Sequence, residues 1–282
     1  MTVREALRCA EEILLDAGVP DARLDAEYLL AGVLDAPRLL VVASGETPLT
    51  DTRAEQYFAL VARRQGREPL QYILGTQPFM GCSFYVDKRV LIPRQDTETL
   101  CEQTLLNTPE TGAALDLCTG SGARAVVIKK ALPALSVSAS DISADALALA
   151  RRNAALNGVS VDFRKGDLFA PFEGERFSVI VSNPPYIPTG CLPSLQEEVR
   201  REPALALDGG ADGLSFYRRI AREAPDHLTE EGVLLLEIGC DQAQAVCRLL
   251  QDAGFAAPQV VRDTAGRDRV IIARTHGGKD HV

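Results

Sequence analysis

The strongest constraint on the fold is a regular alternation of short apolar strands and helical patterns that begins near residue 113. Strand-like runs cover residues 114–117, 137–140, 161–164, 178–181, 233–238 and 269–273, and helical patterns cover 123–131, 144–157, 215–228 and 241–253. Strands joined through helices predict a parallel sheet that is covered on both faces. A strand, turn and strand around residues 264–266 predicts antiparallel pairing at one edge. We therefore predict an α/β domain over residues 96–275.

The first 76 residues follow a different pattern, with apolar side chains at helical spacing. Ala6, Ala10 and Leu14 illustrate this spacing, and the segment holds no His and no pair of residues that suggests catalysis. It predicts a small all-helical domain over residues 1–76 that either recognises a binding partner, such as a substrate, or simply covers another part of the protein. Residues 77–95, with Asp87-Lys-Arg as a polar turn, predict a β-hairpin linker, and residues 276–282 predict a flexible tail.

Charge and cysteine content argue against several classes of function. The 30 Lys and Arg residues face 39 Asp and Glu residues, for a net charge of −9, whereas nucleic-acid-binding proteins are normally basic. We therefore expect no direct nucleic-acid binding. Three His and seven scattered Cys without a CxxC pair disfavour a metal site and are typical of reduced thiols. No apolar run approaches the ~20 residues that cross a bilayer, so we expect a cytoplasmic protein without membrane contact.

A glycine-rich turn after the first strand predicts a cofactor site. Glycines allow close approach of a ligand to the backbone, and the following helix presents free N–H groups. The pattern Gly120-x-Gly122-x-x-Ala125 also satisfies the dinucleotide fingerprint, so this turn alone leaves NAD and other nucleoside cofactors open. The candidate cofactor-binding residues of the turn are Asp116, Cys118, Thr119, Gly120, Ser121 and Gly122.

Acidic residues after the next two strands suit the rest of a nucleoside. Asp141 lies about 20 residues beyond the glycines, where a carboxylate accepts both hydrogen bonds of a ribose diol. Ser143 is the better N-cap for the helix that follows, which leaves Asp141 for the ribose. Asp167 and Leu168 come where an adenine ring would lie, with the carboxylate near the exocyclic amine and the apolar side chain against the ring.

The most specific motif is Asn183-Pro184-Pro185-Tyr186, at the end of the apolar strand 178–181. The two prolines fix φ and remove two donors, so the Asn183 side-chain oxygen and the Pro184 carbonyl form a rigid pair of acceptors. Such a pair suits a planar NH₂ group on an sp² carbon. Tyr186 would supply a face for a flat substrate. We predict that this turn binds the substrate and that Asn183, Pro184 and Tyr186 carry the chemistry.

These motifs together resemble the class I methyltransferases that use S-adenosylmethionine. Segments over residues 68–75, 90–98, 202–213, 236–239 and 263–269 are similar to the HemK/PrmC family of protein-(glutamine-N5) methyltransferases. The resemblance implies a Rossmann-like, seven-stranded domain and S-adenosylmethionine as the methyl donor. It implies methylation of the glutamine in the Gly-Gly-Gln loop of class I peptide chain release factors. It also adds Thr97 and Asn183 to the cofactor-binding residues.

The sequence departs from the family pattern at three positions. Cys118 replaces a frequent glycine, which is tolerable if its φ is negative; Gln95 loosens a proline-rich turn, and Leu168 replaces an aromatic residue. Three alternatives stay open. They are a glutamine methyltransferase of a ribosomal protein, an adenine-N6 methyltransferase of nucleic acid, which can use the same turn on a flipped base, and a catalytically silent S-adenosylmethionine-binding module.

Overall fold

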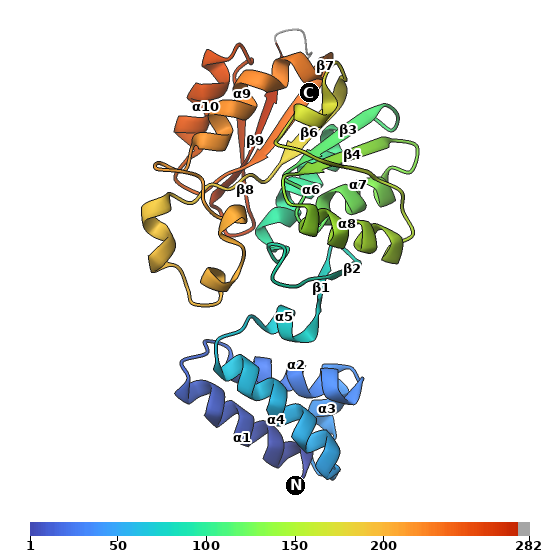
Figure 1. Cartoon of the computed structure of the whole chain (residues 1–282), viewed down its shortest axis with the longest axis vertical. Coiled ribbons are helices and arrows are strands. Elements are labelled where there is room, and N and C mark those ends of the chain that lie inside the picture. The colour runs from blue at the N-terminus through green and yellow to red at the C-terminus, as the bar shows by residue number, and fades with distance from the viewer. Residues whose placement is uncertain (276–282) are drawn as a thin grey trace. The chain divides into compact units, whose positions relative to one another are not determined.

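The computed structural model describes residues 1–275 (Figure 1). The described chain divides into two compact units. The helical unit contains residues 1–76 together with 196–201, and the sheet unit contains the remainder. The short segment 196–201 therefore packs with the helices, although the strand and helix pattern assigns it to the α/β domain. The flexible tail expected over residues 276–282 lies outside the described residues.

The helical unit is built around one apolar core. Its five helices are α1 (Val3–Asp16), α2 (Ala22–Leu34), α3 (Arg38–Ala43), α4 (Asp51–Gln65) and α5 (Leu70–Leu74). A capping box begins α1, because Thr2 and Glu5 each accept the backbone N–H of the other. Ala6, Ala10 and Leu14, which follow the helical spacing of the sequence, are fully buried. The predicted helical fold of this segment is confirmed.

Residues 196–201 join the helical unit through Glu198. Its carboxylate oxygens lie 2.8 Å from Arg64 Nη2 and 2.7 Å from Arg67 Nη2, and Arg64 Nε also lies 2.7 Å from Asp25 Oδ2. Burial opposes ionisation of Glu198, but the hydrogen bonds from Arg67 and Arg64 outweigh burial and hold its pKa at about 2. Ion pairs with Arg64 and Arg67 of the helical unit thus anchor residues 196–201.

The linker contains a hairpin, but its turn is not the predicted one. Strands β1 (Thr76–Phe79) and β2 (Cys82–Tyr85) pair with each other around Met80 and Gly81. Both turn residues have positive φ, +48° and +71°, as two-residue hairpin turns require. The polar triplet Asp87-Lys-Arg lies beyond the hairpin, and residues 90–95 form no strand. The prediction of the turn was wrong because a non-glycine residue occupies the left-handed region.

The sheet unit contains seven strands in the order β5-β4-β3-β6-β7-β9-β8. Their bounds are β3 (Ala113–Leu117), β4 (Ser136–Asp141), β5 (Asp162–Lys165), β6 (Phe177–Ser182), β7 (Leu228–Glu237), β8 (Gln259–Arg262) and β9 (Asp268–Arg274). Strands β3 to β7 pair in parallel, whereas β9 runs antiparallel to both β7 and β8. The predicted Rossmann-like sheet with one antiparallel edge is confirmed.

Helices cover both faces of this sheet (Figure 1). Along β6, Val179 and Val181 pack in the cluster under α6 (Asp96–Asn107), α7 (Ala123–Ala131) and α8 (Ala144–Leu156). Ile180 points to the cluster under α9 (Ser215–His227) and α10 (Ala243–Asp252). The alternation explains why a strand buried on both faces is a continuous apolar run. No helix within residues 1–275 is long and apolar enough to span a membrane.

Candidate active site

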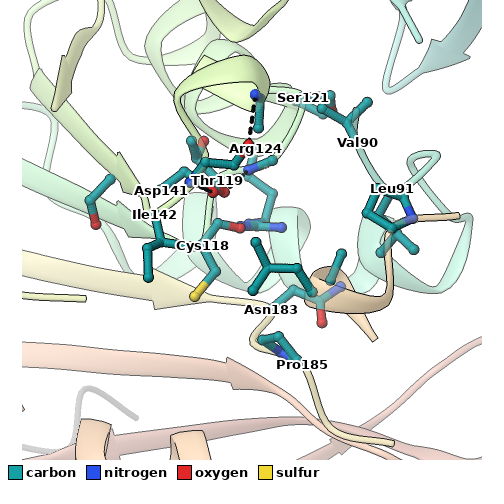
Figure 2. A pocket seen from close by; sticks show the side chains of 18 of the residues that line it. Val90, Leu91, Cys118, Thr119, Ser121, Arg124, Asp141, Ile142, Asn183 and Pro185 are labelled. Atoms are coloured by element: carbon teal, nitrogen blue, oxygen red, sulfur yellow. Dashed lines mark hydrogen bonds between the residues drawn. The ribbon is translucent and has the colours of Figure 1, made fainter. Parts of the chain in front are cut away.

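A cavity opens inside the sheet unit at the carboxyl ends of β3, β4, β5 and β6. The strand order reverses between β3 and β6, and ligands of open α/β sheets bind at such a point. Figure 2 shows Asp141 and Ile142 on one side of the cavity, Val90 and Leu91 on the opposite side, and Asn183 with Pro185 below them. The cavity is thus lined by loops that are far apart in the sequence.

The glycine-rich turn after β3 depends on left-handed backbone. A Cβ atom on Gly120, which has φ +57°, would meet no atom within 4 Å, so the backbone there is open to an approaching ligand. A Cβ atom on Gly122 would lie 3.0 Å from Ala150 Cβ, so this glycine allows the turn to pack on α8. Cys118 has φ +54°, which corrects the expected negative value. The turn imposes this conformation, which costs a non-glycine residue about 1–2 kcal/mol.

Asp116 supports the turn from below. Its carboxylate is fully buried, pairs with Arg124 at 2.8 Å and accepts the Thr119 hydroxyl at 2.6 Å. Arg124 also donates to the carbonyls of Leu117 and Cys118 at 3.2 and 2.7 Å. The pair therefore bridges the end of β3, the turn and the start of α7. Asp116 does not line the cavity, whereas Thr119 and Arg124 do.

Asp141 ends β4 with its carboxylate at the cavity wall. Its oxygens accept the backbone N–H groups of Gly120 and Ser143, each at 2.9 Å. Burial raises the pKa of Asp141, and these N–H groups act against that rise. Ser143 caps α8 through its own hydroxyl, as predicted. The backbone N–H of Ile142 also acts on this carboxylate. A carboxylate has about four lone-pair sites, so acceptor capacity for a ribose hydroxyl remains.

The loop after β5 is held by contacts with β4 and with α9. Leu168 has φ +50°, is buried, and its carbonyl accepts the Ser140 hydroxyl at 2.9 Å. The Asp167 carboxylate pairs with Arg219 of α9 at 2.8 Å, and both side chains are exposed. Both Asp167 and Leu168 line the cavity. Asp167 is thus already partnered, which the sequence pattern did not predict.

The Asn-Pro-Pro-Tyr turn after β6 is fixed by the segment that follows it. Gln242 donates to the carbonyl of Tyr186 at 3.0 Å. Gly209 and Gly213 pack so closely that added Cβ atoms would lie 2.7 Å from Tyr186 Cα and 2.3 Å from its carbonyl oxygen. Burial raises the pKa of the Tyr186 phenol to about 12. Asn183 and Pro185 line the cavity, whereas Pro184 and Tyr186 are not among its lining residues.

A second connection joins the linker to the same side of the cavity. Glu202 is buried, accepts the Ile92 N–H at 2.9 Å and pairs with Arg94. Ile92 and Arg94 line the cavity, as do residues 203–206 apart from Ala204. Glu202 therefore holds two distant parts of the wall together. The family-like motif that begins at Glu202 was the only sequence signal for this contact.

Most of the predicted site residues lie together. Those that line the cavity are Thr97, Cys118, Thr119, Gly120, Ser121, Asp141, Asp167, Leu168, Asn183 and Pro185. Asp116, Gly122, Pro184 and Tyr186 support its walls or lie behind them. Ile142, Phe216 and Arg219 also line the cavity, although no sequence motif predicted them. Ile142 is 50% exposed, which is unusual for an isoleucine directly after a strand. The exposed fraction of a side chain cannot be read from the sequence.

Solved structures with a similar fold are methyltransferases. A methyltransferase from Pyrococcus furiosus aligns with a TM-score of 0.57 and 19% identity over 77% of this chain and 100% of that one. A 16S rRNA N2 G1207 methyltransferase of T. thermophilus, solved with AdoMet and guanosine, aligns with a TM-score of 0.54 and 18% identity over 71% and 50%. At this identity the likeness concerns the fold alone. Residues 95–192 also match the family described as methyltransferase small domain.

The fold and the sequence matches define an S-adenosylmethionine-dependent methyltransferase. Residues 5–75 match the PrmC N-terminal domain. Release factor glutamine methyltransferases of Geobacter sulfurreducens and Moorella thermoacetica are 45% and 44% identical, over 97% of this chain and 96% and 98% of theirs. That of Deinococcus radiodurans is 39% identical over 99% of this chain and 100% of its own. The chain belongs to the release factor glutamine methyltransferase family.

The residues present fit S-adenosylmethionine. Asp141 offers acceptor capacity for a ribose hydroxyl beside the open backbone of Gly120, and Ile142 and Leu168 offer apolar surface near them. Asn183 lines the same cavity, below Asp141 and Ile142 in Figure 2. Within residues 1–275, no group of three or more His, Cys, Asp or Glu side chains is placed to hold a metal ion.

Proposed function

We propose that this protein transfers a methyl group from S-adenosylmethionine to the side-chain amide nitrogen of the glutamine in the Gly-Gly-Gln loop of class I release factors. The observation that carries the proposal is the Asn-Pro-Pro-Tyr turn, which ends β6 in the same cavity as Asp141 and the glycine-rich turn. The full-length relatives support the choice of substrate. The protein acts in the cytoplasm, where translation termination takes place.

The chain contributes orientation more than acid or base chemistry. S-adenosylmethionine would supply a methyl group activated by the adjacent sulfonium, and the S–CH₃ bond that breaks would leave S-adenosylhomocysteine. Asn183 Oδ1 and the Pro184 carbonyl accept the two hydrogens of the glutamine NH₂, which directs the nitrogen lone pair along the cavity. The rigid backbone at Pro184 and Pro185 keeps these acceptors in place. After transfer, the amide nitrogen releases one proton to solvent.

A direct assay tests the proposal. The protein is incubated with radiolabelled S-adenosylmethionine and a class I release factor, the same factor with Glu in place of the loop glutamine, or duplex DNA. We expect label on the unaltered factor alone, at one amide nitrogen by mass spectrometry. Label on DNA, or equal label on the Glu variant, would contradict the proposed acceptor.

The role of Asp141 gives a prediction about cofactor affinity. Asp141→Ala should weaken S-adenosylmethionine binding by about 1.5–3 kcal/mol, since a charged acceptor is lost. Asp141→Asn keeps one acceptor and should lose less. Isothermal titration calorimetry measures both, with Asp145→Ala as the control, because Asp145 is an exposed carboxylate in the first turn of α8, four residues after Asp141. Equal affinity in wild type and Asp141→Ala would remove Asp141 from the ribose role.

We further propose that the helical unit docks the body of the release factor. Its helix α3 buries Val41 but leaves Leu39 and Leu40 exposed by 71% and 62%. Tyr28 of α2 is also 41% exposed and carries Arg38 over its ring. Exposed apolar surface of this kind is typical of protein interaction sites.

If α3 docks the release factor, a substitution on its exposed face should change the affinity for this substrate alone. Leu40→Glu should raise KM for whole release factor about tenfold or more, because burial of a leucine contributes about 1.5–3 kcal/mol. The rate constant kcat and S-adenosylmethionine affinity should not change. Leu106→Glu is the matched control, since Leu106 is 78% exposed on α6 of the sheet unit. Unchanged KM in Leu40→Glu would leave this face of α3 outside the docking surface.

A further inference from the structure

The most unusual polar group in the described chain is Glu237, the last residue of β7. Its side chain lies in the interior, and its Oε2 has no hydrogen-bond partner among the described residues. An unpaired buried carboxylate oxygen destabilises a fold, because it has lost its hydrogen bonds to water. Groups of this kind in native structures call for an explanation other than stability. None of the functions described above uses Glu237.

Glu237 lies behind the Asn-Pro-Pro-Tyr turn and is connected to it through one residue. Thr97 of α6 lies near enough to the Glu237 carboxyl group for its hydroxyl to lower the pKa of that group. The Asn183 Nδ2 donates in turn to Thr97 Oγ1 at 3.4 Å, a long contact. Thr97 and Asn183 line the cavity, whereas Glu237 does not. The three side chains therefore form a line from the protein interior to the proposed substrate amide.

The surroundings of Glu237 act on its pKa in opposite directions, and burial is the largest effect, so the pKa is raised. The Thr97 hydroxyl and the charges of Arg124 and Arg269 act against burial and lower the pKa. Arg124 belongs to the support of the glycine-rich turn, and Arg269 pairs with Asp96 at 3.1 Å and Asp263 at 3.2 Å. An ionised carboxylate can only accept hydrogen bonds.

The contact between Asn183 and Thr97 sets the direction of the hydrogen bonds in the line, and a carboxyl group keeps an acceptor oxygen whether or not it is ionised. A hydroxyl has one hydrogen, so when Thr97 donates it to Glu237, its oxygen can only accept from Asn183. Asn183 must then turn its NH₂ group to Thr97 and its Oδ1 away from it. The two ends of an asparagine amide have nearly the same shape, so their orientation is fixed by hydrogen bonds alone. Without Glu237, Thr97 could donate to Oδ1, and Asn183 would present NH₂ to the substrate.

We propose that Glu237 is a positioning residue that acts through Thr97 to hold Asn183 with its carbonyl oxygen facing the substrate amide. The inference rests on the proposed function, because it explains how Asn183 keeps its Oδ1 as an acceptor beside the Pro184 carbonyl. It also changes the role of Thr97, which the family resemblance places among the cofactor-binding residues. Thr97 then connects the buried Glu237 carboxyl group to the acceptor pair of Asn183 and Pro184, which we call the amide clamp.

The first test measures rate and specificity in two variants. Glu237→Gln, which can donate as well as accept, and Thr97→Val, which has the same shape without a hydroxyl, should each lower kcat about 10–100-fold, the range for residues that orient a functional group. KM for release factor should stay within about threefold. Thr97→Ser should restore most of kcat. Glu231→Gln is the matched control, because Glu231 is exposed on the same strand.

A second readout responds only to the orientation of Asn183. The wild-type clamp should bind a release factor with Glu in the loop more weakly than the glutamine form, because two carbonyl oxygens face a carboxylate. In Thr97→Val and Glu237→Gln this preference should shrink at least severalfold, since Asn183 can turn its NH₂ outward. An unchanged preference in both variants, or wild-type kcat in both, would overturn the proposal.

A double variant separates positioning from a general loss of structure. If Glu237 acts through Asn183, then Glu237→Gln should lower kcat little or not at all in an Asn183→Ala background. Additive losses would show that Glu237 acts by another route and would overturn the proposal. Failure of the wild-type chain to methylate the loop glutamine would contradict the proposed function instead, so the two failures are distinguishable.

Discussion

Asn183→Ala should lower the single-turnover rate of methyl transfer by about 10²–10³-fold, far more than it lowers the affinity for the release factor. Loss of one well-placed polar group has an effect of this size at sites that work by hydrogen-bond positioning. Asn183 is half-buried at the end of β6 and lines the cavity, with its Nδ2 turned to Thr97. The alanine variant retains the rigid backbone of the prolines and one acceptor, the Pro184 carbonyl.

The measurement uses saturating cofactor and release factor, so that binding defects do not contribute. Asn157→Ala is the control, because Asn157 is also a half-buried asparagine of the sheet unit and its side chain donates to the Ser83 and Asn153 carbonyls. Asn183→Asp adds a negative charge beside the sulfonium, and it should bind cofactor while it misplaces the amide. A rate within a few-fold of wild type in Asn183→Ala would exclude the clamp.

The sequence predicted best those parts of the site that depend on local patterns. Continuous apolar runs fix the strands, and each strand of a parallel sheet brings its following loop to the same edge. Asp141 and Asn183 could therefore be placed near each other although 42 residues separate their numbers. The N-cap at Ser143 was also predictable, because a hydroxyl at the start of a helix has one main role.

The sequence could not predict contacts that depend on how separate loops pack. Glu198 joins Arg64 across 134 residues, and Glu202 joins Ile92 across 110. Neither pair has a spacing that periodicity can detect. The hairpin turn at Met80 was missed for a related reason, since positive φ at a non-glycine residue leaves no mark in composition. The Glu237 line joins α6, β6 and β7, and only the fold brings these elements together.

Asp116→Ala should destabilise the sheet unit by about 3–5 kcal/mol, the cost of leaving a buried charge without its partner. Arg124 is almost fully buried, and Asp116 is the carboxylate with which it pairs, at 2.8 Å. The two carbonyl acceptors of Arg124, at Leu117 and Cys118, cannot neutralise its charge. Circular dichroism in increasing urea measures the effect, since the sequence contains no tryptophan.

The same change should weaken cofactor binding, because Asp116 also accepts the Thr119 hydroxyl and so orders the turn that lines the cavity. Asp116→Ala combined with Arg124→Met removes both charges, so this double variant should be more stable than Asp116→Ala alone. A single variant as stable as wild type would mean that water or a neighbouring group satisfies Arg124. Since the pair joins β3 to α7 beneath Gly120, the loss of cofactor affinity should follow the loss of stability in both variants.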